Sequence, residues 1–494
     1  MLTSSFKKNQ LLLILIILLA STLRLYNLGK QSLWLDETYS VMMSNDLHTI
    51  WAEQTKDSSP PLYYSMLHFW IFCFGKSEVS LRLLSALFGI LLIPLVFVAG
   101  TNIFSRKTGF FASLFAALSP YHIYYSQEAK VYSLLALLSL ASFLMLYLSI
   151  RENRIIFWVA YVLSTIFCLY THNYGILLLI AEFFFCIFYH PKAKALLNTI
   201  ISFICIFIAF LPRIPILSIQ AIIDINPWIE VAKIKDLIST FKYFCLLSWR
   251  LPTTQLLSLA LKIAIPLFAI IFVFGLFNRR KENVFLFTYF FIPLGIAFLI
   301  SLKKPIYVAG RYDMLVFPAF CLIMGAGLSK IKIYFLRQFL LVSIIIVTLL
   351  SLFHYYFIYR KSNDRYISKY VQKYSDKKDI IVATELSIVP FEYYWKQDFQ
   401  PQLFQFPNGP KSALVKEALV GDKKYINSEI RELIEKIYPL LKQGNKLWVL
   451  YQPFTFSDKL LEALGKEFEN TNIINYLKGD NLNQISKIYI FKRR

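Results

Sequence analysis

The amino-acid sequence predicts a polytopic α-helical membrane protein with about 11–13 transmembrane helices and a small C-terminal α/β domain outside the membrane. Of the 494 residues, 57% are apolar and 17% are charged, whereas soluble chains are usually about 45–50% apolar and about 25% charged. The acidic residues are also unevenly distributed, because residues 358–494 hold 16 of the 30. We therefore expect a membrane domain over residues 1–357, with an outer loop at about 24–81, and a soluble domain over residues 358–494.

The membrane spans follow from the apolar runs, since a helix needs about 20 mostly apolar residues to cross a bilayer. Lys7 and Lys8 precede the first run, which starts at Leu11, and this pattern predicts an uncleaved signal-anchor with a cytoplasmic N-terminus. Ten further spans are expected at residues 82–103, 108–121, 131–150, 155–171, 174–190, 197–217, 255–277, 284–302, 312–329 and 335–357.

The charges of the connecting loops test this assignment of spans and the side of the membrane on which each loop lies. The N-terminus and the loops that should be cytoplasmic hold 14 basic residues and only two acidic ones, as the positive-inside rule requires. Residues 60–75 are apolar enough to pass for a span, but counting them would put these basic clusters outside. We therefore expect 60–75 to form a helix in, or dipping into, the outer membrane interface. The odd number of spans then places residues 358–494 outside a multi-pass cell-membrane protein.

The soluble domain is expected to be mixed α/β. Strand-like runs occur at 379–384, 446–451 and 486–491, and helical patterns occur near 426–443 and 457–468. The net charge of +22 could indicate nucleic-acid binding. Membrane topology explains most of that charge, so no nucleic-acid partner is expected.

The acidic residues predicted to lie outside suggest chemistry at the outer face. Asp36 and Glu37 lie in the run Trp34–Tyr39, directly after the first span. One carboxylate could serve as general base for an incoming hydroxyl while the other orients the site. A solvated helix start flanked by interfacial aromatic residues is the alternative.

Other polar residues occur on the same predicted side. Asp57 precedes a pair of prolines, and Arg82 begins the next span, where it could also extend to lipid headgroups. Glu128 and Lys130 lie in a tyrosine-rich loop that could bind a sugar or a phosphate. His172 lies in a later turn, where a structural hydrogen bond is the alternative.

A group of basic residues runs against the positive-inside trend. Lys303, Lys304 and Arg311 all fall on the predicted outer side, and Tyr312 follows directly. Phosphate is the natural partner of such a group, because arginine offers a bidentate fork and lysine a point charge. Attraction to lipid headgroups is the alternative.

Three of these motifs together resemble the C-type (GT-C) glycosyltransferases, in particular relatives of protein O-mannosyltransferases and lipid A aminoarabinose transferases. They are Asp36-Glu37, the segment Pro60-Pro61-Leu62, and the helix start that runs from Arg82 through Ser85-Ala86 to Gly89. Their order and spacing within residues 24–132 carry the resemblance. One departure is Ser59, where the family often has a histidine, and it bears on the type of acceptor.

The resemblance implies an inverting transfer of a sugar from a polyprenyl-phosphate-linked donor to an acceptor hydroxyl. Asp36 would be the general base and Glu37 would orient the site. The leaving phosphate would be held by cations, and Glu128 would bind sugar or support the base. The substrate-binding residues expected on these grounds are Asp57, Arg82, Glu128, Lys130, His172, Lys303, Lys304, Arg311 and Tyr312.

The resemblance also implies the partners. These are the lipid-linked donor, a lipid, protein or polysaccharide acceptor, and membrane lipids. The mechanism requires no cofactor, and no metal-ligand set is visible in the sequence, although a divalent metal is not excluded. Two alternatives stay open: a transporter or flippase for a lipid-linked sugar, and an oligosaccharide ligase or polymerase.

Overall fold

A computed structural model describes residues 2–55, 59–222, 229–247, 255–384, 387–396, 402–407, 423–451, 455–475 and 487–494. The contacts among these residues define two compact units. The first unit holds the described residues up to 28, then 46–222 and 229–358. The second holds residues 29–45 and the described residues from 359 to the end.

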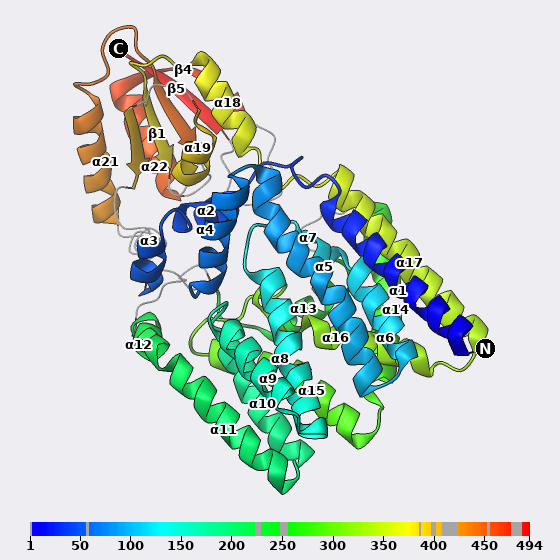
Figure 1. Cartoon of the computed structure of the whole chain (residues 1–494). Helices are drawn as coiled ribbons and strands as arrows, with labels where there is room; N and C mark the ends of the chain where they lie inside the picture. Colours follow the sequence, from blue (N-terminus) through cyan, green and yellow to red (C-terminus); the bar gives the residue numbers. More distant parts are fainter. Residues whose placement is uncertain are drawn as a thin grey trace. The chain divides into compact units, whose positions relative to one another are not determined.

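The first unit is helical (Figure 1). Its α-helices are α1 (Leu2–Leu25), α3 (Leu47–Ala52), α4 (Leu62–Phe74), α5 (Glu78–Ile103), α6 (Arg106–Leu118), α7 (Pro120–Ser126), α8 (Tyr132–Glu152), α9 (Ile155–Leu169), α10 (Gly175–Tyr189), α11 (Ala193–Phe210), α12 (Ile214–Ile222), α13 (Ile234–Leu246), α14 (Gln255–Leu276), α15 (Arg280–Ser301), α16 (Phe317–Lys330) and α17 (Tyr334–Phe357). Short 3-10 turns occur at η1 (Glu53–Thr55), η2 (Leu211–Arg213) and η3 (Tyr312–Val316).

The predicted polytopic helical fold is confirmed. Each of the eleven expected spans coincides with a helix. Among the residues that the structure describes, six helical segments are long and apolar enough to cross a membrane, by length and composition. These are residues 78–103, 132–152, 193–222, 280–301, 312–330 and 334–357. Residues 60–75, expected as an interfacial helix, form the 13-residue α4. At about 1.5 Å per residue, α4 is too short for a hydrocarbon core of about 30 Å.

Small residues let the helices of the first unit approach closely. A Cβ added to Gly100 on α5 would lie only 2.6 Å from the Cα of Gly109 on α6. Likewise, a Cβ on Gly325 of α16 would lie 2.7 Å from the backbone of Thr108 and Ala112. Such small-residue contacts are typical of packed membrane helices. They bring α5, α6 and α16 together into the centre of this unit.

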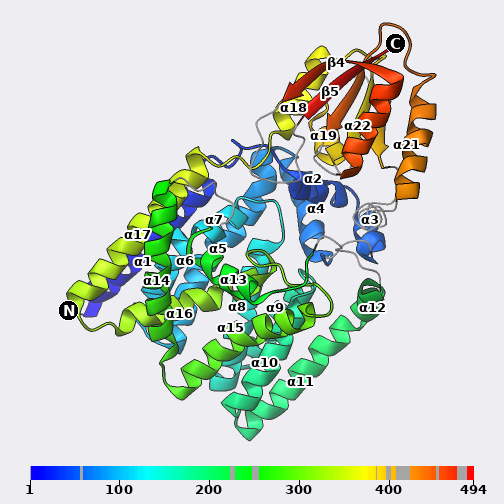
Figure 2. The same cartoon turned by 180° about the vertical axis from the view of Figure 1, so that it is seen from behind.

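The second unit contains a five-stranded sheet (Figure 2). Its strands are β1 (Ile380–Thr384), β2 (Gln402–Phe406), β3 (Leu447–Tyr451), β4 (Phe468–Asn475) and β5 (Lys487–Arg493), in the order β2-β1-β3-β5-β4. Strand β1 is parallel to β2 and β3, while β5 is antiparallel to β3 and β4. The mixed α/β prediction is therefore confirmed, and the three predicted strand runs match β1, β3 and β5.

Helices cover both faces of this sheet. On one face, α21 (Lys423–Ile437) and α22 (Thr455–Glu467) pack against apolar side chains such as Val382 and Val449. On the other face, α18 (Asp364–Tyr374) and α19 (Ile388–Tyr394) pack against Ile381 and Trp448. The sheet is thus the middle layer of a three-layer sandwich.

The second unit also includes a segment from near the N-terminus. Helix α2 (Leu35–Met43) packs against α19, where Trp34 and Leu35 are buried with Val389. Residues 29–45 were predicted as part of the outer loop of the membrane domain. In the structure, their contacts group them with residues 359–494.

Candidate functional site

Asp36 and Glu37, the predicted catalytic pair, occupy the first turn of α2. The side chain of Glu37 is fully buried, and its Oε2 accepts a hydrogen bond from the backbone N–H of Trp34 at 3.3 Å. This bond caps the start of the helix. Asp36 is less buried than Glu37. The two adjacent carboxylates therefore lie in different environments, and the division of roles between them stays a prediction.

Glu37 also forms an ion pair within the second unit. Its Oε2 lies 3.8 Å from Nζ of Lys361, and both side chains are almost fully buried. Lys361 follows the last helix of the predicted membrane domain, more than 300 residues along the chain from Glu37. A buried carboxylate requires such a partner, because an uncompensated charge is costly away from water.

In the first unit, Lys130 lies among tyrosines. Its Nζ donates to the hydroxyl of Tyr64 at 3.4 Å and lies 5.7 Å from the centre of that ring. The backbone carbonyl of Lys130 accepts a bond from the Ser85 hydroxyl at 3.1 Å, and Ser85 is 2.8 Å from the hydroxyl of Tyr63. Ser85 therefore ties the helix of the Arg82–Gly89 motif to α4 and to the loop that carries Lys130.

The neighbouring site residues Arg82 and Glu128 are buried as well. Arg82 donates to the backbone carbonyl of Leu28 at 2.9 Å. Both residues belong to the first unit, and they lie near the two ends of the predicted outer loop. Glu128 is fully buried, and its backbone carbonyl accepts from the N–H of Lys130 at 2.7 Å. This local bond holds the two charged residues in one tight turn.

Arg311 is held against Tyr132. Its Nε donates to the Tyr132 hydroxyl at 2.6 Å, and its guanidinium lies 5.7 Å from the centre of the ring. Burial lowers the pKa of Arg311. Tyr312, the next residue, packs its ring 4.9 Å from that of His172. Arg311, Tyr132, Tyr312 and His172 thus form a cationic aromatic cluster.

The turn that carries Arg311 is fixed by the carboxylate of Asp313. This buried group accepts bonds from the hydroxyls of Tyr121 at 2.9 Å and Thr240 at 2.6 Å, and from the backbone N–H of Gly310 at 2.7 Å. Gly310 has a φ of +70°, a conformation that suits glycine. Asp313 was not among the site residues predicted from the sequence.

His172 is neutral at physiological pH in this structure. Burial, with the positive charge of Lys130, lowers the pKa of His172 to about 3. Its Nδ1 accepts a hydrogen bond from the backbone N–H of Tyr174 at 3.1 Å, which requires an unprotonated nitrogen. The influence of Lys130 connects this histidine electrostatically to the loop of Glu128 and Lys130.

Two predicted cations lie apart from the contacts of this cluster. Lys303 is exposed. The amino group of Lys304 donates to the backbone carbonyls of Gln220, at 3.3 Å, and Ala221, so it satisfies carbonyls at the end of α12. Asp57 lies outside the described residues. Of the predicted binding residues, the structure therefore links Lys130, His172, Arg311 and Tyr312 most directly.

A buried arginine that sequence reasoning passed over sits at the end of α11. Arg213 donates to Oε1 of Gln54 and, at 3.2 Å, to Oδ1 of Asn173. Gln220 joins the same network through Asn173 at 3.0 Å and the backbone carbonyl of Gln54 at 2.6 Å. The network ties η1, η2 and the His172 turn together. The signal in the sequence was an arginine at the outer end of a predicted span.

Arg24 is a second buried arginine, at the end of α1. It donates to the backbone carbonyls of Ala116 and Ala117 at 2.8 and 3.0 Å, and one of its nitrogens lies 2.7 Å from Nδ1 of His122. Gly89 of the Arg82–Gly89 motif faces Arg24: a Cβ at this position would lie 3.3 Å from Nε of Arg24 and 2.2 Å from the hydroxyl of Ser126. Glycine at 89 is therefore required by close packing.

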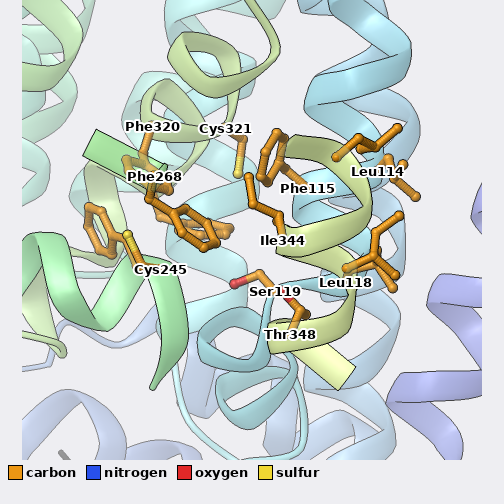
Figure 3. Close-up of a pocket in the computed structure, with 14 residues that line it drawn as sticks. Leu114, Phe115, Leu118, Ser119, Cys245, Phe268, Phe320, Cys321, Ile344 and Thr348 are labelled. Carbon is orange, nitrogen blue, oxygen red and sulfur yellow. The ribbon is translucent and has the colours of Figure 1, made fainter. Parts of the chain in front are cut away.

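An apolar pocket lies elsewhere in the first unit (Figure 3). It is a small cavity of about 20 Å³ between α6, α13, α14, α16 and α17. Phenylalanine rings line much of it, among them Phe115, Phe244, Phe268, Phe317 and Phe320. The lining is mostly apolar and therefore does not suit a charged group. Among the residues that the structure describes, no group of three or more His, Cys, Asp or Glu side chains could hold a metal ion.

The comparisons with known proteins agree with this architecture. Residues 58–219 match the family model described as dolichyl-phosphate-mannose-protein mannosyltransferase. The chain is similar to ArnT from Cupriavidus metallidurans at 12% identity, with 97% of each chain covered and a TM-score of 0.62 for the apo state. A structure of that ArnT bound to undecaprenyl phosphate gives a TM-score of 0.57 over the same coverage.

A second similar fold is the Archaeoglobus fulgidus oligosaccharyltransferase. The identity is 12% and the TM-score 0.59, with 90% of this chain and 69% of that one covered. None of the curated proteins matches the chain at the sequence level. The resemblance to GT-C glycosyltransferases predicted from the sequence is confirmed: a segment matches a mannosyltransferase family, and the whole fold is the one that these membrane glycosyltransferases share.

The packing at Gly89 gives a first prediction. We expect Gly89→Ala to destabilise the protein by about 1–3 kcal/mol, the usual cost of overpacking, because Ser126 has no space to yield. The matched control is Gly295→Ala on α15, where a Cβ meets nothing within 4 Å and alanine should be neutral or stabilising. Thermal unfolding in detergent measures both. Equal midpoints for the two variants would contradict the account.

The neutral state of His172 gives a second prediction. In the unfolded chain histidine titrates near pH 6.5. As the pH falls below that value, His172 binds a proton in the unfolded state but stays neutral in the folded state until the pH approaches 3. Wild type should therefore lose about 2 kcal/mol of stability from this group between pH 7.5 and 5. The His172→Gln variant lacks this titrating group and does not lose that stability, so its thermal unfolding midpoint at pH 5 should approach or exceed that of wild type. A difference between the two that is the same at both pH values would refute the assignment.

Proposed function

We propose that the protein is a membrane glycosyltransferase that moves a sugar from a polyprenyl-phosphate-linked donor to an acceptor hydroxyl at the outer membrane face. The observation that carries this proposal is the cluster of Lys130 and Arg311 among buried tyrosines, in a chain whose fold is shared with ArnT. Tyrosine hydroxyls and two cations are groups that can bind a sugar and its phosphate. The undecaprenyl phosphate in a structure of ArnT supports a lipid phosphate as the carrier.

The proposed reaction is a single displacement with inversion. Asp36 takes the proton from the acceptor hydroxyl while that oxygen forms a bond to the anomeric carbon. The bond from the anomeric carbon to the phosphate oxygen breaks, and polyprenyl phosphate leaves with the electron pair. Arg311 and Lys130 hold the charge that develops on the phosphate. Arg82, Lys303 and Lys304 are weaker candidates for this role. Asp57, a carboxylate, remains a candidate for substrate binding on sequence grounds alone.

The remaining residues would orient the substrates. Glu37 is buried beside Asp36 and would position it, while Glu128, His172 and Tyr312 would contact the sugar. The lipid tail of the donor would lie among the phenylalanine-rich helices. The mechanism assigns no step to a metal or cofactor.

A transporter role is less well supported. It would need a polar path across the bilayer, and Glu182 is an acidic residue in the middle of the expected span at residues 174–190. Its carboxylate accepts from the hydroxyls of Ser142 and, at 3.1 Å, Tyr161, while Ser142 lies 2.6 Å from Thr165. These bonds join α8, α9 and α10. Glu182 is thereby accounted for as a buried cross-link between three helices.

The base is tested by Asp36→Asn. Purified protein is incubated with labelled polyprenyl-phosphate sugars and a membrane extract, and release of polyprenyl phosphate is followed by mass. Loss of a general base should lower kcat by roughly 10²–10⁴-fold. The matched control is Asp46→Asn, an exposed carboxylate that caps α3 through Thr49 at 2.8 Å, and it should retain wild-type activity.

The outcomes separate the hypotheses. Consumption of one donor by wild type but not by Asp36→Asn supports the transferase and its base, and the product mass distinguishes a single sugar from a whole glycan, as a ligase would move. Full activity in Asp36→Asn means that another group is the base. Inert wild type over a broad donor panel would leave the transport alternative as the better explanation.

The phosphate-binding role of Arg311 is tested by Arg311→Gln. Removing one preorganised charge from the leaving group should lower kcat by roughly 10²–10³-fold. Arg280→Gln removes an exposed arginine at the start of α15 and should change neither kcat nor KM. Activity of Arg311→Gln within about twofold of the control would exclude Arg311 as the main phosphate ligand.

A further inference from the structure

The segment that leads into α2 is bound to the second unit through its backbone. Arg365 donates to the carbonyls of Gly29 at 3.0 Å and Gln31 at 3.1 Å. The backbone N–H of Lys361 donates to the side-chain carbonyl of Gln31 at 2.7 Å. The three bonds fix this segment against Lys361 and against Arg365 in the first turn of α18.

The next residues are fixed from α19. The backbone N–H of Leu33 donates to the hydroxyl of Tyr394 at 2.6 Å, and both residues are buried. Trp34 and Leu35 then pack on Val389 of the same helix. Tyr394 is itself held in place, because its backbone carbonyl accepts from Gln372 of α18 at 2.8 Å. The start of α2 is thus determined by two helices that cover one face of the sheet.

The buried pair of Glu37 and Lys361 sets the rotation of α2 about its axis. Successive residues on a helix point about 100° apart, so the direction of Glu37 determines the direction of Asp36. The Glu37 carboxylate accepts the capping bond from the backbone N–H of Trp34 and forms the ion pair with Lys361. Rotation of α2 would separate the Glu37 carboxylate from Lys361 and break this buried ion pair, which is costly away from water.

We propose that the C-terminal domain is the positioning element for Asp36, with Lys361 and Tyr394 as positioning residues that fix the helix on which the base is carried. This inference rests on the proposed function, because it assigns Asp36 the chemistry. It gives residues 358–494 a role that needs no acceptor recognition. Neither Lys361 nor Tyr394 touches the donor in this account, so their loss should lower kcat and leave KM for the donor almost unchanged.

The test uses the full-length protein and two independent readouts. Lys361→Met removes the ion pair, Lys361→Arg restores the charge, and Tyr394→Phe removes only the bond to Leu33. The control is Lys373→Met, which removes an exposed lysine from α18. Amide hydrogen exchange of peptides covering residues 30–44 reports the fixing of α2 without any donor. Steady-state kinetics then separate kcat from KM.

Lys361→Met is expected to accelerate exchange in residues 30–44 at least tenfold and to lower kcat by roughly 10²-fold, the scale of a misplacement near 1 Å, with KM within about twofold. Lys361→Arg should recover kcat to within about fivefold. Tyr394→Phe is a milder change, so an effect in this variant would not be attributable to general unfolding. It should lower kcat by several-fold and accelerate amide exchange at Leu33. Lys373→Met should match wild type in both readouts.

A further variant checks the electrostatic origin of the effect. In Lys361→Met combined with Glu37→Gln no charge is left buried without a partner, so exchange in residues 30–44 should return part of the way toward wild type. No return would mean that Lys361 acts through packing and would overturn the ion pair as the cause.

The result that overturns the proposal is wild-type kcat in Lys361→Met and Tyr394→Phe, or a rise in KM with kcat unchanged, which would indicate substrate binding instead. Failure of the proposed function gives a different pattern. Asp36→Asn assayed in parallel would then be fully active, or every donor would be inert, while the exchange measurement still decides whether Lys361 holds α2.

Discussion

A charge buried away from water must be paired or hydrogen-bonded, and the placement of functional groups in both units depends on this constraint. Asp313 accepts three hydrogen bonds and so fixes the turn of Arg311. Glu37 faces Lys361 and so fixes α2. Arg24 and Arg213 donate to backbone and side-chain oxygens that tie neighbouring segments together. In each case the need to satisfy one buried group determines where a neighbouring side chain can point.

The two units hold their functional residues in position by different means. In the first unit, glycines allow helices to approach closely, and a tyrosine-rich layer then holds Lys130 and Arg311 by hydroxyl and ring contacts. In the second, a sheet covered on both faces supplies a rigid base for α18 and α19, which carry α2. Rigid support of this kind is what a proton-transfer group requires, since a small displacement costs much of the rate.

The sequence was most informative where the physical signal is local. Long apolar runs and the sign of loop charges predicted the spans, and the fully buried strands β1 and β3 were found because their residues are continuously apolar. Strands β2 and β4 were missed: β2 is only partly buried, and β4 is rich in asparagine, so neither shows a clear alternation. Helix α19 was missed because it is short and contains Pro390.

The site was predictable only in part, because the sequence shows local signals but not contacts between distant segments. Asp36 and Glu37 stood out as adjacent acids after a span, and the structure buries them unequally, while their catalytic roles stay a prediction. Lys361 could not be found, because its partner lies more than 300 residues earlier. Lys304 looked like a phosphate ligand by charge alone, but its contact with the end of α12 depends on how two distant loops pack.

The central claim, a single displacement at the anomeric carbon by an acceptor hydroxyl, is tested most directly by the stereochemistry of the product. The measurement is the anomeric configuration of the transferred sugar, read by nuclear magnetic resonance of the purified product against a donor of known configuration. The account predicts inversion in every turnover. Retention of configuration would require two displacements through a covalent intermediate and would contradict it.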